Sequence, residues 1–163
     1  MAILCQTDRS FSGLNNPQPR IRAALLLTGR GNKLLLIQQE KNGERYWLAP
    51  GGGVNYGETI VDALSRELEE ELNIHTLDIG RLCLMHESIA PDKSRHIVNV
   101  YFEGNTEDTP VLGGEPNLVD MGYFSSAEIL QMDIRPPVNH LLAAYLDGTL
   151  NQMDSVYTGT YWK

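Results

Sequence analysis

The chain has 163 residues, of which 42% are hydrophobic and 21% are charged, a composition typical of a folded domain rather than a disordered chain. Its 13 Lys and Arg residues against 21 Asp and Glu residues give a formal net charge of −8, so its long-range field would repel a nucleic-acid polymer. The apolar runs fall far short of the ~18 residues that a membrane-spanning helix needs, which argues against a membrane span.

The first part of the chain predicts three strands and a glycine-rich loop. Two apolar runs of strand length, residues 20–27 and 33–38, are separated by five residues that include two glycines, which favours a hairpin. A third short strand is predicted at residues 46–49, where Pro50 and three consecutive glycines stop it. A loop is therefore expected before the next element.

Residues 58–73 predict the main helix. This segment contains no Gly or Pro, and its apolar residues recur at the spacing of one helical face. The members of this apolar stripe are Val61, Leu64, Leu68 and Leu72.

The second half of the chain predicts further strands and two shorter helices. Strands are expected at residues 77–86, 96–103 and 119–124. A capping box from Ser125 to Glu128 predicts a short helix, and Pro136 starts a last helix that Gly148 ends. A helix inserted among strands, with further helices after them, predicts an α/β fold with a mixed sheet covered on both faces.

Three carboxylates share one side of the main predicted helix. At about 100° per residue, Glu70 and Glu71 lie about −60° and +40° from Glu67, so this arc borders the apolar stripe. Like charges at these spacings repel, and more strongly where they are partly desolvated. A divalent cation would compensate them, and oxygen ligands without nearby His or Cys favour Mg²⁺ or Mn²⁺ over zinc.

The glycines before this helix suit a phosphate or a cation. Because Gly51, Gly52 and Gly53 carry no side chains, their backbone carbonyls and amides can approach such a ligand closely. The nearby helix N-terminus adds a positive dipole. We therefore expect a local anion site in an otherwise acidic chain.

The segment from Gly52 to Ile74 resembles the Nudix box, the signature of Nudix hydrolases. Asn73 stands where the family usually has Gly, and Asn tolerates the left-handed conformation at a helix end. The flanking strands extend the resemblance over residues 20–148. It implies a Nudix-type α/β/α sandwich with a central mixed sheet and a loop–helix–loop. The matching polar positions within the box are Glu58, Arg66, Glu67, Glu70 and Glu71.

The resemblance implies attack of water on a phosphorus of a nucleoside diphosphate that is linked to another group. ADP-ribose or a nucleoside diphosphate sugar is favoured, because Pro91 lies where ADP-ribose-cleaving members often carry proline. Gln38 and Gln39 replace the Arg typical of members that clean nucleotide pools. Hydrolysis of nucleoside triphosphates is the alternative, and a non-catalytic Nudix-fold nucleotide sensor is the alternative from another class.

The resemblance also implies roles for individual residues. The catalytic set is Glu67, Glu70, Glu71 and Arg66, with the arginine pinning the acids. The cation ligands are the Gly51 carbonyl, Glu67, Glu70, Glu71 and, from a later loop, Glu115, with Asp120 as second choice. The substrate-binding residues are Gly52, Gly53, Glu58 and Asn139. Which glutamate serves as the general base is left open.

We expect a single domain over residues 1–163, with its core at residues 20–148 and an aromatic tail at residues 149–163. The tail would dock on the domain or on a partner subunit, which leaves a homodimer open. A small nucleotide is the expected ligand. Residues 1–13 lack the basic start and apolar stretch of a signal peptide, and two cysteines are too few for a disulfide framework, so a cytoplasmic location is expected.

Overall fold

A computed structural model describes residues 18–153 and 155–162, so the expectation drawn from residues 1–13 lies outside the described part. The elements, in chain order, are β1 Arg20–Gly29, β2 Lys33–Lys41, β3 Glu44–Leu48, α1 Ile60–Leu72, β4 Asp78–Ile89, β5 His96–Asn105, β6 Leu118–Phe124, α2 Ser126–Ile129, α3 Asn139–Leu146, the 3-10 turn η1 Leu150–Gln152 and β7 Tyr157–Thr160. No helix among the described residues is long and apolar enough to cross a bilayer.

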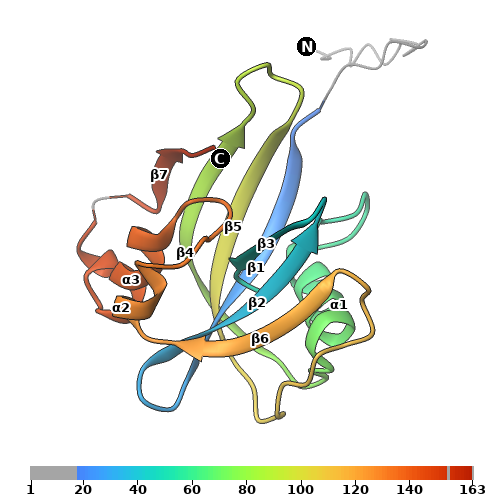
Figure 1. The fold of residues 1–163 in the computed structure, drawn as a ribbon, viewed down its shortest axis with the longest axis vertical. Coiled ribbons are helices and arrows are strands. Elements are labelled where there is room, and N and C mark those ends of the chain that lie inside the picture. Colours follow the sequence, from blue (N-terminus) through green and yellow to red (C-terminus); the bar gives the residue numbers. More distant parts are fainter. Residues whose placement is uncertain (1–17, 154, 163) are drawn as a thin grey trace, which may run out of the picture.

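The strands form one mixed sheet in the order β3-β2-β1-β5-β4-β7, with β6 also paired to β2 (Figure 1). The predicted hairpin of β1 and β2 is correct only at its turn, where Thr28 pairs with Leu34 and Gly29 with Lys33. Beyond the turn, β1 runs parallel to β5 while β2 pairs with β3 and β6. The sheet therefore opens between β1 and β2.

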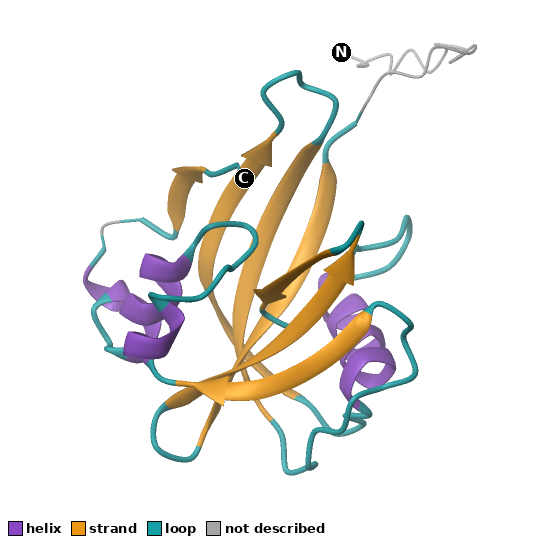
Figure 2. Cartoon of the chain, in the orientation of Figure 1, coloured by secondary structure: helices purple, strands orange, loops and turns teal. Residues whose placement is uncertain are grey.

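Helices cover both faces of the sheet, as Figure 2 shows with α1 on one side and α2 and α3 on the other. Side chains alternate along β1: Leu25 belongs to the core beneath α1, and Leu26 belongs to the core beneath α2 and α3. Both residues are fully buried, which explains why β1 reads as a continuous apolar run. The α/β fold with a mixed central sheet is confirmed.

The residues at the two ends of helix α1 explain where it begins and where it ends. The hydroxyl of Thr59 accepts a hydrogen bond from the Asp62 amide at 3.1 Å, which caps the first turn. Asn73 adopts the left-handed conformation with φ 53°, and its backbone amide donates to the Glu69 carbonyl. The expectation that Asn73 keeps the helix-ending turn is confirmed. The helix is shorter than predicted because Glu58 belongs to the preceding loop.

Several element ends differ from prediction, and pairing partners account for the differences. Strand β2 continues past the apolar run because Lys41 pairs with Glu44 of β3. The last helix starts at Asn139 and not at Pro136. Strand β7 was not predicted. It is short, and it forms by pairing in parallel with β4.

The carboxy-terminal tail docks on the sheet through β7 and the residues after it. The Tyr161 amide donates to the Glu87 carbonyl at 2.8 Å. The Tyr161 ring meets His86 edge-on, with 5.4 Å between ring centroids. The described part of the tail therefore packs against its own domain.

The buried His86 makes stability sensitive to acid. Its side chain is fully buried, its Nε2 lies 3.2 Å from the Tyr101 hydroxyl, and burial lowers its pKa to about 4. An unfolded chain would protonate this histidine below pH about 6.5, whereas the folded protein would not, so His86 lowers stability as the pH falls from about 6.5 to about 4.

We expect the wild type to lose about 2 kcal/mol more unfolding free energy than His86→Gln between pH 7.5 and pH 5. Urea unfolding of both proteins at the two pH values measures this difference. Equal losses in the two proteins would show that His86 does not carry the acid sensitivity.

Candidate active site

The glycine-rich loop is held against β1 by backbone hydrogen bonds. The amides of Leu25 and Ala23 donate to the carbonyls of Pro50 and Gly52, both at 2.9 Å. The Val54 amide then donates to the Ile21 carbonyl at 3.0 Å. The loop thus runs beside β1 almost as an extra strand, which fixes its position relative to the sheet.

Two of the glycines are required by close contacts. Gly51 has φ +129°, and a Cβ there would overlap the Ala23 carbonyl of β1. A Cβ on Gly52 would overlap the carboxyl group of Glu67. The loop therefore brings its backbone directly against one acid of α1.

Arg66 ties the loop to the acids of α1. Its Nε and Nη2 donate to the two carboxylate oxygens of Glu58 at 2.8 and 2.9 Å, and Nη1 donates to Glu67 at 2.6 Å. Nη2 also donates to the Gly53 carbonyl at 3.1 Å, while Glu70 lies 3.3 Å from Nη1. These hydrogen bonds from Arg66 lower the pKa of Glu58 to about 2. The arginine thereby orients the loop and two acids at once.

The three acids of α1 differ strongly in burial. Glu71 is 5% exposed, whereas the side chains of Glu67 and Glu70 are 16% and 47% exposed. The carboxylate of Glu71 accepts a hydrogen bond from the Gly51 amide at 2.8 Å. Burial raises the pKa of Glu71 to about 8, with contributions from the negative charges of Glu67 and Glu115. Without a bound cation, Glu71 is therefore mostly protonated at neutral pH.

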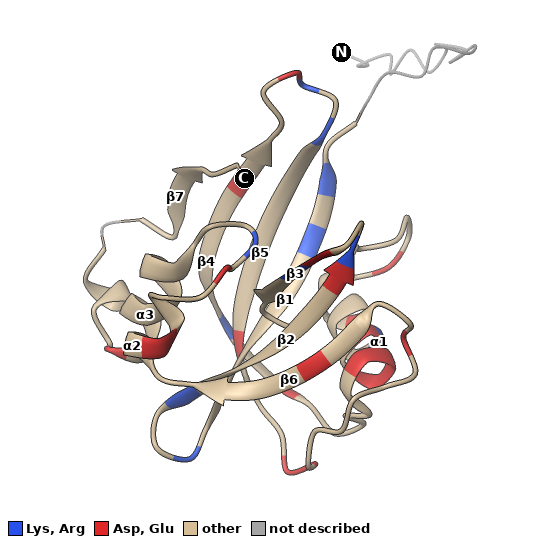
Figure 3. Cartoon of the chain, viewed as in Figure 1, with Lys and Arg blue, Asp and Glu red and all other residues tan. Residues whose placement is uncertain are grey.

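A pocket of about 350 Å³ lies beside two of these acids, Glu67 and Glu71. Its acidic members are Glu67, Glu71 and Glu115. Its basic members are Arg20, Arg22, Lys41 and Arg95. Figure 3 shows basic segments on β1 and at the tip of β2, beside the acidic segments of α1. In a chain with a net charge of −8, basic and acidic residues thus line the same pocket. This combination suits the binding of a cation and an anion side by side.

Arg22 is one of the basic residues that line this pocket. Its Nη2 donates to the carbonyls of Ala49 and Gly51 at 2.7 and 3.0 Å. Its Nη1 is buried and has no hydrogen-bond partner among the described residues. A buried donor without a partner is costly, so an anionic oxygen in this pocket would satisfy it.

The donors at this site fit a hard divalent cation. No three His, Cys, Asp or Glu side chains in the described part of the chain already form a closed ligand set. The carboxylates of Glu67, Glu71 and Glu115 nevertheless line one pocket together with the Gly51 backbone. All are oxygen donors, the type that Mg²⁺ and Mn²⁺ prefer. Burial chiefly, and the charges of Glu67 and Glu115 to a smaller extent, raise the pKa of Glu71, and a bound cation would favour its ionised form.

The other candidates lie elsewhere. Glu70 is exposed on α1 and is not among the residues lining the acidic pocket. Glu58 binds Arg66 and the Asn55 amide, so it supports the loop from outside the pocket. Asp120 pairs with Gln38 within the sheet and does not line the pocket either, unlike Glu115.

The structure does not bring Asn139 to the acidic site. Its side-chain amide donates to the carbonyls of Ile129 and Met132, both at 2.8 Å. Asn139 thus joins the start of α3 to the end of α2, and the geometry gives no support to its predicted contact with substrate. A first-turn position on the last helix could not reveal that these donors are used internally.

The basic residues of the pocket were missed by the sequence reasoning. Arg20 and Arg22 alternate at the start of β1, the pattern of two side chains on one face of a strand. Arg95 lies in the loop between β4 and β5, and Lys41 ends β2. Only the pairing of β1 with β5 and the course of the glycine loop bring these residues together.

Comparisons with known proteins agree with this geometry. The NUDIX domain family model matches residues 18–145. Phosphatase NudJ of Escherichia coli strain K12 is 29% identical over 122 residues, which are 74% of this chain and 78% of that protein. A NUDIX hydrolase from Nitrosomonas europaea superposes with a TM-score of 0.70 at 20% identity, over 85% of this chain and 97% of that one. An ADP-ribose pyrophosphatase from Streptococcus suis superposes with a TM-score of 0.62 at 17% identity, over 90% of this chain and 100% of that one. The two solved structures show a shared fold.

Proposed function

The chain belongs to the NUDIX domain family and is an enzyme of the Nudix pyrophosphohydrolase type, and from this premise we propose that it is a Mg²⁺-dependent hydrolase of a nucleoside diphosphate linked to a second group. Mn²⁺ could replace Mg²⁺ in the same role. The ligand is a small nucleotide and not a nucleic-acid polymer.

One observation carries the proposal: the acids and the basic side chains line the same pocket. Glu67, Glu71 and Glu115 supply negative charge to hold a cation. Arg20, Arg22, Lys41 and Arg95 supply positive charge to hold the phosphates. A binding site for the cation alone would not need the arginines, and a site for the anion alone would gain nothing from three acidic residues in its lining.

The carboxylates of Glu67, Glu71 and Glu115 would hold the cation, with the Gly51 carbonyl as a further oxygen donor. A cation bound there offsets the charge of the diphosphate and makes an attacking water more acidic. The exposed Glu70 would join the set only after its side chain leaves Arg66, from which it now lies 3.3 Å.

The protein's own side chains orient an acid, bind a phosphate oxygen and accept a proton. Arg66 holds the Glu67 carboxylate in place through its 2.6 Å hydrogen bond and is fixed in turn by Glu58. The free Nη1 of Arg22 points to a role in binding a phosphate oxygen, because that donor is otherwise unpaired. One carboxylate of the α1 acids takes the proton of the attacking water.

The proposed substrate is ADP-ribose or a nucleoside diphosphate sugar. Such a molecule has a group on each side of its diphosphate, and a second pocket of about 320 Å³ adjoins the acidic one. The two pockets share six lining residues. These are Arg22, Gln39, Lys41, Leu48, Arg95 and Ile97. A diphosphate at the acids would leave room for one attached group next to it.

A substrate panel tests this choice. We expect kcat/KM for ADP-ribose or a nucleoside diphosphate sugar to exceed that for every nucleoside triphosphate, with Mg²⁺ present. Both classes are assayed at equal concentrations, and the products are separated by chromatography. A triphosphate preferred tenfold or more, about 1.4 kcal/mol in the transition state, would reverse the assignment of substrate class.

A further inference from the structure

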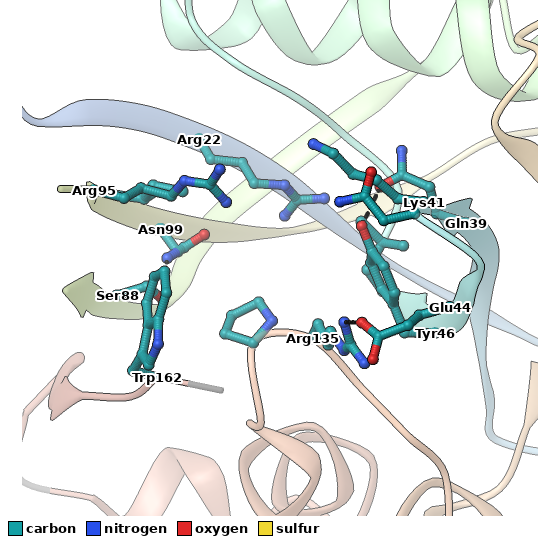
Figure 4. A pocket seen from close by; sticks show the side chains of 14 residues that line it. Arg22, Gln39, Lys41, Glu44, Tyr46, Ser88, Arg95, Asn99, Arg135 and Trp162 are labelled. Atoms are coloured by element: carbon teal, nitrogen blue, oxygen red, sulfur yellow. Dashed lines mark hydrogen bonds and ion pairs between the residues drawn. The ribbon is translucent and has the colours of Figure 1, made fainter. Parts of the chain in front are cut away.

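The second pocket has walls suited to a flat ring (Figure 4). Trp162 stands on one side of it, and Arg135 and Tyr46 stand on the other. The Arg135 guanidinium lies over the Tyr46 ring, 4.5 Å from its centroid. The pocket is therefore lined by an aromatic side chain on one side and by an arginine stacked on a tyrosine on the other, and its volume of about 320 Å³ is in the range of ligand sites.

The fold itself places Trp162 at this pocket. Strand β7 pairs in parallel with β4, and the Tyr161 amide donates to the Glu87 carbonyl at 2.8 Å. Trp162 follows Tyr161, just as Ser88 follows Glu87, and both Trp162 and Ser88 line the pocket. The Tyr161 ring packs against His86 and holds this part of the tail. Trp162 nevertheless stays 40% exposed, so it has surface free for a ligand.

Polar groups also line the pocket. Ser88 and Asn99 are 5% and 2% exposed, and the Asn99 side-chain amide donates to the Ser88 hydroxyl at 3.2 Å. The Nε of Arg135 is buried and has no partner among the described residues. A ring that carries a hydrogen-bond acceptor could supply a partner for Arg135 Nε, whereas a purely apolar ring would leave this nitrogen unpaired.

The pocket is continuous with the proposed phosphate site. Arg22, Lys41 and Arg95 line both pockets, and Figure 4 shows the three basic side chains on the side of the pocket opposite Arg135. A ligand with its diphosphate at the acids would pass these charges before its attached ring reached Trp162. The order of side chains thus matches the order of groups in a nucleotide.

We propose that this pocket binds the nucleobase of the substrate and that Trp162 is the surface on which the base stacks. This inference rests on the proposed function for the position of the diphosphate. Arg135, held on Tyr46, forms the opposite wall. The aromatic end of the tail is therefore part of the substrate site and sets its preference for a ring-bearing diphosphate.

The test separates binding of the base from binding of the diphosphate. Dissociation constants are measured by calorimetry with Mg²⁺ for α,β-methylene-ADP and α,β-methylene-UDP, whose bridging carbon resists hydrolysis, and for methylenediphosphonate, which lacks the nucleoside. The variants are Trp162→Ala and Trp162→Phe. Tyr157→Ala is the matched control, because Tyr157 is an exposed aromatic residue of the same tail and does not line the pocket.

We expect Trp162→Ala to raise the dissociation constant of at least one of the two nucleotides by about tenfold, which is the effect of losing one base–aromatic stack. Trp162→Phe should retain most of the affinity, while Tyr157→Ala and the binding of methylenediphosphonate should be unchanged. Unchanged nucleotide binding in Trp162→Ala would overturn the proposal, as would nucleotides that bind the wild type no more tightly than methylenediphosphonate.

This binding experiment is independent of turnover. A wild type that hydrolyses no diphosphate, with nucleotide binding that still depends on Trp162, would reject the proposed function and leave the base pocket standing. Normal hydrolysis with identical nucleotide affinities in the wild type and Trp162→Ala would reject the base pocket and leave the proposed function standing.

Discussion

Replacing Glu71 by Gln is expected to lower kcat/KM by roughly 100- to 1,000-fold while the fold is retained. Glutamine has nearly the same shape, and its amide oxygen can still accept the hydrogen bond from the Gly51 amide. It cannot supply the negative charge that the proposed cation needs. Steady-state kinetics with Mg²⁺ on the best substrate of the panel measures the loss.

Glu69→Gln is the matched control for this experiment. Glu69 belongs to the same helix, but its side chain is 62% exposed and its carboxylate lies 3.5 Å from Nδ1 of the exposed His75. We expect its kcat/KM to stay within about twofold of the wild type. Glu70→Gln should also lose most turnover if Glu70 joins the active arrangement. Unchanged rates in both Glu70→Gln and Glu71→Gln would reject the assignment of these acids.

The same Glu71→Gln substitution should stabilise the protein when no divalent cation is present. Burial raises the pKa of Glu71 to about 8, whereas an unfolded chain ionises this group above its ordinary value near 4.5. The folded state therefore holds a proton that the unfolded state releases, and stability is lost as the pH rises from about 4.5 to about 8. At pH 7 the expected gain for the variant is about 3 kcal/mol.

Urea unfolding in the presence of EDTA measures this gain, and repeating it at pH 4.5 should abolish the gain. Glu69→Gln should change the unfolding free energy by less than about 0.5 kcal/mol, as is usual for an exposed position. Added Mg²⁺ should stabilise the wild type more than Glu71→Gln, because binding to the folded state alone adds stability. A metal-free Glu71→Gln protein no more stable than the wild type would contradict the conclusion that burial raises the pKa of Glu71 and lowers stability at neutral pH.

The acids of α1 could be placed from the sequence because helical geometry is local. On the helical wheel, Glu71 lies nearest the apolar stripe and Glu70 lies farthest from it. The structure buries them in that order, with Glu71 at 5% exposed and the Glu70 side chain at 47%. The left-handed Asn73 followed from the same kind of reasoning, since a helix end is decided within a few residues.

The basic half of the site could not be found in this way. Arg22 and Arg95 are 73 positions apart in the sequence, and they meet at one pocket only because β1 pairs with β5 across the sheet. The placement of Trp162 likewise depends on β7, a strand whose pairing with β4 has no local signal. Long-range strand pairing, unlike helical periodicity, leaves no fixed spacing in the sequence.

The position of Asn139 illustrates a different limit. Its residue type and place in the last helix allowed either a contact with substrate or a local role. The two hydrogen bonds to Ile129 and Met132 support the local role. Choosing between these options required the relative placement of α2 and α3, which the sequence pattern does not contain.

Chromatographic product analysis tests the central claim most directly. Wild-type protein is incubated with ADP-ribose and with a nucleoside diphosphate sugar, first with Mg²⁺ and then after the cation is removed with EDTA. The account predicts cleavage within the diphosphate to a nucleoside monophosphate and a second phosphomonoester with Mg²⁺, and no products with EDTA. Intact nucleotides after long incubation with Mg²⁺, despite saturable binding, would contradict the account and identify the protein as a nucleotide sensor.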